Sequence, residues 1–380
     1  MQTSQVLINN MFNHIQIDRV GLFEGFWNET LEKWVAEGYP TRTVVVNGEE
    51  TTKPEDPWLY FDFDLQKTGG YFDTEPKLGF EALVDETDEW KVVKNGAGAT
   101  LKWWKHKSGT PEHIDFSVNN RKIWEEEYRP HLLSLNPDRF NCKWWRGDNT
   151  LEDDLHDLKW ARERNKWAFY GHVFVVEIMR NMLGDFNLYQ SFLLDPEWIH
   201  DICHVYTHFF KQHFTYLFEK NGLPDGVWFF EDIAYKNGLF ASPKTYSDLI
   251  IPYYQEMVSF FNDLGLPVIF HTDGNIDQGL PLIIDSGFVG LNPIEVKAGC
   301  DIFDYTDKYG DELVFIGGLD VRILETNDRD IIRKEIIHLI EGMKKRNARY
   351  VFGSDHTVTP NVDFDSYQFA LDVYHQHKMF

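Results

Sequence analysis

Acidic, amide and imidazole side chains follow one apolar segment after another in the second half of the chain. Five apolar runs with the length of buried strands end in groups that can bind a metal ion or move a proton. These groups are Glu231 and Asp232, His271 and Asp273, Asn292 and Glu295, Asp320, and Ser354 with Asp355 and His356. Carboxylates and imidazoles are common zinc ligands and common general acids and bases. The pattern predicts a site of metal-assisted or acid–base chemistry.

The clearest of these segments runs from Leu264 to Cys300. An apolar run stops at His271, a helix-like segment follows, and a second apolar run stops at Asn292. Strand, polar cluster, helix, strand and polar cluster is the order of a βαβ unit. In an α/β barrel the active site lies at the carboxyl ends of the strands, so this segment indicates an enzyme.

The elements that must position these groups repeat regularly from about residue 151 onward. Alternating strand-like and helix-like segments favour an α/β fold, a (β/α)8 TIM-type barrel, over a doubly wound sheet. No G-x-G-x-x-G motif follows an early strand, which removes the main support for a dinucleotide-binding fold. We expect residues 151–380 to hold the main βα repeats of a single barrel domain.

Residues 1–150 are expected to supply N-terminal helical and β-hairpin extensions together with the first part of the same barrel. A hairpin is predicted around Asn95 and Gly96, which favour tight turns. The segment Trp58–Leu65 alternates aromatic and acidic residues and is predicted to be a strand that ends near Asp62 and Asp64. Residues 47–56 are predicted to form a loop.

Composition excludes several classes of function. The 380-residue chain has a net charge of −24, whereas nucleic-acid binding requires a basic surface. Three scattered cysteines do not make a disulfide framework, which suits a reducing compartment. We see neither a signal peptide nor an apolar run of the roughly 18 residues that a membrane span needs. We therefore expect a cytoplasmic enzyme with a small-molecule substrate, and a homodimer stays open.

Five motifs carry a resemblance to a known family. They are Phe230-Glu231-Asp232, His271-Thr272-Asp273-Gly274, Glu295 with Gly299, Phe315–Asp320 and Gly353–His356. Together they resemble the uroporphyrinogen decarboxylase superfamily, which also contains the corrinoid-dependent methyltransferases. The resemblance implies a distorted barrel with N-terminal extensions and one pocket at the carboxyl ends of its strands. The segments Phe26–Thr30 and Trp34–Pro40 look like those of members that are not decarboxylases.

Two departures from the family's motifs decide between its chemistries. The decarboxylases carry an Arg-Gln-Ala-Gly-Arg segment that grips porphyrinogen carboxylates, and here Ile17–Phe23 lacks it. Thiol-activating members bind zinc through His-x-Cys and a later Cys, whereas here Asp273 and Ser354 stand at or near those positions. Oxygen and nitrogen ligands suit a harder Zn²⁺ that polarises the oxygen of a methyl ether or methanol. This resembles the first methyltransferase of bacterial O-demethylase systems.

The resemblance therefore implies a zinc-assisted methyltransferase that passes a methyl group to the cobalamin of a small corrinoid-binding partner protein. We expect His271, with Glu295 and Glu231 or Asp273, to hold Zn²⁺. The remaining candidates have two predicted roles. Catalytic roles fall to His271, Asp273, Asp64, Asp355 and His356, and substrate binding falls to Glu231, Asp232, Asn292, Asp320 and Ser354.

Two other functions stay open at this point. In the first, the protein is a metal-free decarboxylase of a porphyrinogen or a smaller acid, in which Asp64 stabilises positive charge on a protonated pyrrole. In the second, it is a non-catalytic barrel that binds a ligand or a partner. Stoichiometric zinc would favour the methyltransferase. Protein without zinc and with an arginine-lined pocket would favour the decarboxylase. A His271→Ala variant with unchanged metal content and unchanged activity would favour the non-catalytic barrel.

Overall fold

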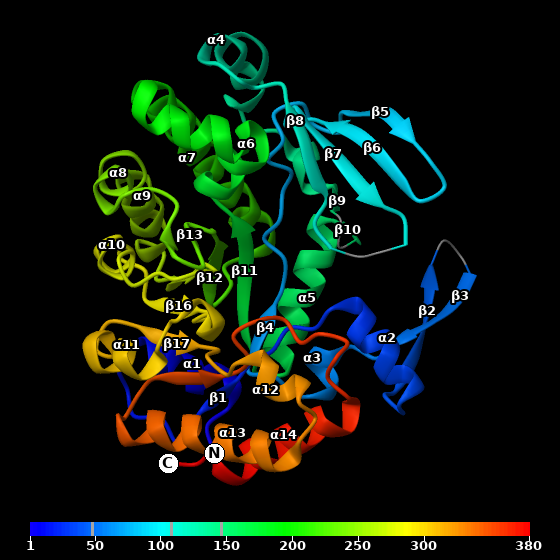
Figure 1. Ribbon diagram of the computed structural model, residues 1–380, viewed down its shortest axis with the longest axis vertical. Coiled ribbons are helices and arrows are strands. Elements are labelled where there is room, and N and C mark those ends of the chain that lie inside the picture. The colour runs from blue at the N-terminus through cyan, green and yellow to red at the C-terminus, as the bar shows by residue number, and fades with distance from the viewer. Residues whose placement is uncertain (47–48, 107–108, 145–146) are drawn as a thin grey trace.

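Eight parallel strands form a nearly closed barrel in the computed structural model, which describes residues 1–46, 49–106, 109–144 and 147–380 (Figure 1). The hydrogen-bonded order is β1-β18-β17-β16-β15-β12-β11-β4. The strands are β1 (Gly21–Leu22), β4 (Leu65–Lys67), β11 (Trp167–Val173), β12 (Gly226–Phe230), β15 (Val268–His271), β16 (Gly290–Asn292), β17 (Val314–Ile316) and β18 (Tyr350–Phe352). The predicted TIM-type barrel is confirmed.

Side chains that alternate along the strands fill the interior of the barrel, as the two-residue period of a strand requires. One buried cluster joins the inward residues Leu65, Trp167, Phe169, Trp228, Ile269, Val314, Ile316 and Val351. Helix α1 (Ser4–Phe12) adds Leu7, Ile8 and Met11 to the same cluster, so an N-terminal helix closes the barrel interior. Gly21 is needed at this contact, because a Cβ there would meet Val351 at 3.0 Å and Ile8 at 3.3 Å.

Helices cover the outside of the barrel (Figure 1). They are α5 (Leu151–Glu163), α6 (Val175–Leu194), α7 (Pro196–Asn221), α8 (Pro243–Leu249), α9 (Ile251–Asn262), α10 (Leu280–Asp285), α11 (Ile302–Tyr309), α12 (Val321–Glu325), α13 (Arg329–Lys345) and α14 (Phe364–His377). Helix α6 is kinked at Gly184, whose φ of 74° is left-handed. In the described part of the chain, none of the helices has the length and apolarity to cross a bilayer.

The N-terminal extensions lie around this barrel. They comprise α2 (Asn28–Ala36), the hairpin of β2 (Thr41–Val46) and β3 (Glu49–Pro54), α3 (Pro57–Tyr60), and an antiparallel sheet of β5 (Glu81–Glu86), β6 (Trp90–Asn95), β7 (Ala99–Trp104) and β8 (Glu112–Phe116). Short elements follow, namely α4 (Arg121–Ile123), β9 (Cys142–Trp144) and β10 (Gly147–Asn149), with the small β13 (Ala234–Tyr235) and β14 (Gly238–Leu239) hairpin later. The predicted β-hairpin extension is confirmed.

Two sequence predictions in this region were wrong. Residues 49–54, predicted as loop, form β3 and pair with β2. The segment Trp58–Leu65 is not a strand, because Asp56 accepts a hydrogen bond from Trp58 N–H and starts the helical turn α3 with Pro57 at its first position. The strand β4 begins only at Leu65, so Asp64 precedes the strand and lies at its amino end.

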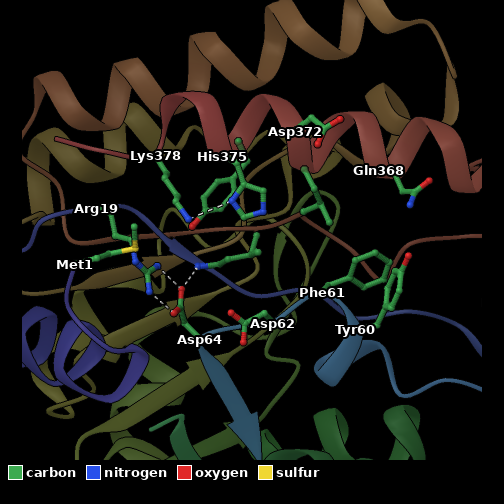
Figure 2. A pocket seen from close by; sticks show the side chains of 13 residues that line it. Met1, Arg19, Tyr60, Phe61, Asp62, Asp64, Gln368, Asp372, His375 and Lys378 are labelled. Carbon is green, nitrogen blue, oxygen red and sulfur yellow. Dashed lines mark hydrogen bonds and ion pairs between the residues drawn. The ribbon is translucent and has the colours of Figure 1, made fainter. Parts of the chain in front are cut away.

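Asp64 closes the barrel between its two edge strands, a junction that we call the seam (Figure 2). Its N–H donates to Leu22 O at 2.9 Å, and Leu22 N–H donates to its Oδ2 at 2.8 Å. Arg19 donates to both carboxylate oxygens at 2.7 and 2.6 Å, and Ser4 Oγ donates to Oδ1 at 2.6 Å. Both oxygens are therefore occupied, and Arg19 and Asp64 form a buried ion pair. This bonding gives Asp64 a structural role.

We expect Asp64→Asn to lower the free energy of unfolding by about 3–5 kcal/mol, because it leaves the Arg19 charge buried without its partner. Urea denaturation followed by circular dichroism measures the loss. Asp248→Asn is the matched control: it breaks the exposed Lys244–Asp248 pair at 2.6 Å and should cost no more than about 1 kcal/mol. Equal effects of the two variants would contradict a structural role for Asp64 at the seam.

Candidate metal centre

Three side chains at the carboxyl ends of two neighbouring strands form a group that can hold a metal ion. Asp232, His271 and Asp273 each offer one ligand atom, and these atoms lie within 4.8 Å of one another. Strands β12 and β15 run parallel with Phe230 opposite His271, so the residues that follow them emerge side by side. All three side chains are partly exposed, so a small ligand can reach them.

The alternation of the strands decides which carboxylates belong to this group. Trp228 and Phe230 of β12 pack with the barrel interior, and the same parity places Asp232 on the inner side. Glu231 has the opposite parity and is fully buried outside the barrel. Its carboxylate accepts hydrogen bonds from Val176 N–H at 3.0 Å, Glu177 N–H at 3.3 Å and Tyr254 Oη at 2.5 Å. Glu231 thus ties β12 to helices α6 and α9.

His271 is held in one tautomer by Asn292. Asn292 Nδ2 donates to Ile316 O at 3.0 Å, which turns its Oδ1 toward His271 Nδ1 at 2.6 Å. Because an amide oxygen only accepts, Nδ1 carries the proton, and the neutral imidazole that a metal ion requires then offers the lone pair of Nε2. Such an outer hydrogen bond orients a metal-binding histidine. Asn292, predicted to bind substrate, is therefore placed to orient His271.

The two aspartates of the group lie close enough to affect each other. Asp273 N–H donates to Asp232 Oδ1 at 3.0 Å. Burial raises the pKa of Asp273, the charge of His271 lowers it, and the charge of Asp232 raises it again. A bound cation would relieve both the burial and the repulsion, so the residues fit a divalent ion such as Zn²⁺.

Aromatic rings line the barrel beside His271. The ring of Phe230 meets the His271 ring edge to face at 5.4 Å, and Trp228 stacks behind Phe230 at 6.0 Å. Phe23 follows β1, and its ring centroid lies 5.1 Å from that of Trp228 and 5.2 Å from that of Trp58. Phe23, Trp58 and Phe230 are partly exposed. They give the metal ligands an apolar wall that excludes water from one side.

Two other predicted residues lie near the group without joining it. Glu295 accepts a hydrogen bond from Gly274 N–H at 2.6 Å and lies 3.3 Å from Lys297 Nζ. Its charge raises the pKa of Asp273, so it contributes negative potential rather than a ligand atom. The charge of His356 lowers the same pKa, and its side chain is partly exposed. His356 therefore stays a candidate for proton transfer. Of the predicted ligands, His271 and Asp273 belong to the group, whereas Glu231 and Glu295 lie outside it and Asp232 joins it.

The remaining candidates serve the loops around the site. Asp355 accepts hydrogen bonds from Val296 N–H at 2.9 Å and Val321 N–H at 2.8 Å, which ties the loops after β16 and β17 together. Asp320 caps helix α12 and forms an ion pair with Arg322 at 2.6 Å. Both carboxylates are engaged with protein groups, so the geometry favours structural roles over the predicted catalytic and substrate-binding ones.

Comparison with known proteins gives the family. A family model described as uroporphyrinogen decarboxylase (URO-D) matches residues 178–377, more than half of the chain. The chain belongs to the uroporphyrinogen decarboxylase family. The match covers every strand end that carries the metal group. No curated protein gives a significant match.

One solved structure matches the fold over the whole chain. A methyltransferase from Methanosarcina mazei superposes with a TM-score of 0.66 at 13% sequence identity, covering 99% of each chain. At this identity the likeness shows the fold alone. A Xaa-Pro dipeptidase with methionine bound in its active site gives a TM-score of only 0.25 at 12% identity, covering 47% of this chain and 43% of its own, and carries no argument.

One buried acid of this uroporphyrinogen decarboxylase family member, Glu24, was not predicted from the sequence. Glu24, just after β1, accepts hydrogen bonds from Ser354 N–H at 3.0 Å and Ser354 Oγ at 2.5 Å. It thereby joins the first and last strands of the barrel, and Ser354, predicted to bind substrate, is bonded to it. Burial raises the pKa of Glu24 to about 7. Its sequence signal is an acid directly behind a very short apolar run.

We expect three variants to separate the metal ligands from their neighbours. Asp273→Asn removes a charged ligand and should abolish stoichiometric zinc, whereas Glu231→Gln should keep roughly one zinc per chain. Asn292→Ala frees the His271 ring and should weaken zinc binding about 10–100-fold. Plasma mass spectrometry and chelator competition measure content and affinity. Loss of zinc from Glu231→Gln with retention in Asp273→Asn would contradict the group and favour the alternative from the sequence in which Glu231, and not Asp273, is the ligand.

Glu24 should make stability depend on pH. Its folded pKa of about 7 exceeds the ordinary value of 4.5, so folding takes up a proton between these two values. The stability that it contributes is complete below the ordinary pKa and is lost as the pH rises through about 7. Relative to the wild type, Glu24→Gln should therefore gain stability between about pH 5 and about pH 8. The urea midpoints of the wild type and of Glu24→Gln across this pH range test the sign of the difference in stability. Midpoints that change with pH in parallel in the two proteins would refute the prediction.

Proposed function

We propose that this protein is a metal-assisted, corrinoid-dependent methyltransferase. It moves a methyl group from a small oxygen donor, such as a methyl ether, to a corrinoid that a small partner protein carries. The proposal is supported by the family, by the whole-length fold likeness to a methyltransferase and by the group of Asp232, His271 and Asp273. Methyl ether and corrinoid come from the resemblance of the motifs, and the metal group supports the choice of an oxygen donor.

The observation that carries the proposal is the ligand group with its oriented histidine. Two carboxylates and one neutral imidazole make a ligand set of three, which is the number that catalytic zinc sites use while leaving a position for substrate. A Zn²⁺ ion bound there would polarise the oxygen of the methyl donor as a Lewis acid. The absence of a thiolate from this group favours an oxygen donor over a thiol.

The residues around the ligands would bind and orient the donor. The rings of Phe23, Trp58 and Phe230 offer apolar faces to the carbon body of the donor and keep water away from the reacting oxygen. Breaking the methyl–oxygen bond leaves an alkoxide or phenoxide that needs a proton. His356 is partly exposed and within electrostatic reach of Asp273, so it is our candidate to hold that proton.

A decarboxylase that depends on Asp64 has less support. Asp64 lies at the amino end of β4, whereas the metal group lies at the carboxyl ends of β12 and β15. Its two carboxylate oxygens already accept hydrogen bonds from Arg19, Leu22 and Ser4. A carboxylate that is fully bonded and stands at the amino end of its strand is badly placed to stabilise charge on a bound pyrrole.

Methyl transfer can be measured with free cob(I)alamin as the acceptor and a panel of methanol, alkyl and aryl methyl ethers as donors. We expect the zinc-loaded protein to consume the Co(I) absorbance with one donor class, and Asp273→Asn to be slower by at least about 100-fold. Glu231→Gln is the matched control, because it changes a buried carboxyl next to the ligand Asp232. Its rate of methyl transfer should stay within about tenfold of the wild-type rate.

Two outcomes would overturn the proposal. Protein that holds no zinc and decarboxylates a porphyrinogen would establish the decarboxylase. Protein that binds zinc, transfers no methyl group from any donor of the panel and is unchanged by His271→Ala would support a non-catalytic barrel.

A further inference from the structure

A cavity lies beside the seam, next to helix α14. It has a volume of about 420 Å³ and lies between helix α14 and the segment that runs from Tyr60 to Asp64 (Figure 2). Arg19 and Leu22 line it from the strand side, and Leu371, His375 and Lys378 line it from α14 and the residue that follows it. The volume falls within the range of small-molecule sites. The proposed methyl transfer does not use this cavity.

Arg19 and Lys378 are the cationic side chains of the lining, and Asp62, Asp64 and Asp372 are the acidic ones. Arg19 is paired with Asp64, and Asp62 is paired with Lys166 at 2.5 Å. Lys378 Nζ has a hydrogen bond only to His375 Nδ1 at 3.2 Å, and it lies within 4.0 Å of no carboxylate in the described residues. Burial and the neighbouring Arg19 charge lower the pKa of Lys378. Lys378 therefore lines the cavity without an ion-pair partner in the described residues, although the charges of Asp64 and Asp62 act on it from further away.

Arg19 adds an unused donor. The side chain is more than nine-tenths buried, and its Nε–H has no hydrogen-bond partner in the part of the chain that the structure covers. A buried donor without a partner is costly, because it has lost its water without replacement. An anion in the cavity would supply an ion-pair partner for Lys378 and would be attracted by the nearby Arg19 charge.

The rest of the lining indicates which kind of anion the cavity would accept. Leu22, Leu371 and the packed rings of Tyr60 and Phe61, whose centroids lie 4.9 Å apart, offer an apolar surface. Asp62 and Asp64 line the same cavity, so they would repel a dianion such as phosphate more strongly than a monoanion. Asp372, the other acid in the lining, is exposed on α14 and is screened by water.

We propose that this cavity binds a small monocarboxylate with an apolar body. The carboxylate lies between Lys378 and the guanidinium of Arg19, and the apolar body packs against Leu371 and Phe61. The ligand thus contacts the same Arg19 that holds Asp64 at the seam. The proposal does not depend on the metal group or on methyl transfer.

Isothermal titration with benzoate, 4-methylpentanoate, acetate and inorganic phosphate as probes tests the inference. We expect benzoate or 4-methylpentanoate to bind the wild type with a Kd of about 1 mM or tighter, and acetate and phosphate to bind more weakly. Lys378→Met should weaken the best carboxylate at least about tenfold, because it keeps the length of the side chain and removes the charge. Lys308→Met, on an exposed helix face, should bind it as the wild type does.

The same probes distinguish the cavity from the metal site. Asp273→Asn should bind the carboxylate as tightly as the wild type, and Lys378→Met should keep its zinc. A rise in melting temperature with the carboxylate, present in the wild type and missing in a folded Lys378→Met protein, would support the site independently. The inference is overturned if no carboxylate binds, if phosphate binds most tightly, or if Lys378→Met binds like the wild type.

Discussion

Closure of the barrel at the seam is the constraint on which the rest of the structure depends. Strands β1 and β4 are only two and three residues long, and they form the two edges of the sheet. The backbone and carboxylate of Asp64 both bond to Leu22, and Arg19 neutralises the buried charge. Because parallel edges left unpaired bury orphan peptide groups, this ion pair and its hydrogen bonds replace a strand ladder that the short edges cannot make.

Alternation along the strands separates two kinds of carboxylate in the closed barrel. Inward parity places Asp232 and Asp273 beside an aromatic wall, where they repel each other and where a cation would stabilise both. Outward parity buries Glu231 against helices α6 and α9, where backbone N–H groups and a tyrosine satisfy it. Two consecutive residues after strand β12 thus have different roles: Asp232 is available for chemistry, and Glu231 attaches the helices.

Residues at the seam link the cavity beside α14 to the aromatic wall next to the metal group. Leu22 lines the cavity, and the next residue, Phe23, belongs to the aromatic wall beside Trp228 and Trp58. Glu24 then joins the first strand to Ser354 after the last one. Three consecutive residues therefore connect the cavity, the wall and the closure of the barrel, which explains why so short a strand is packed on both faces.

The sequence by itself determined the periodic βα units, the barrel, the family and His271 with its acidic neighbours, because apolar runs and the polar residues that end them are local signals. Only the tertiary structure decided which carboxylates meet. Glu231 and Asp232 are equivalent in sequence, and the two-residue period of β12 sends just one of them inward. Asp64 looked like a strand end, yet the turn that Asp56 and Pro57 begin moves it to a strand start. The partners that occupy its carboxylate lie 42, 45 and 60 residues away along the chain, which no local pattern records.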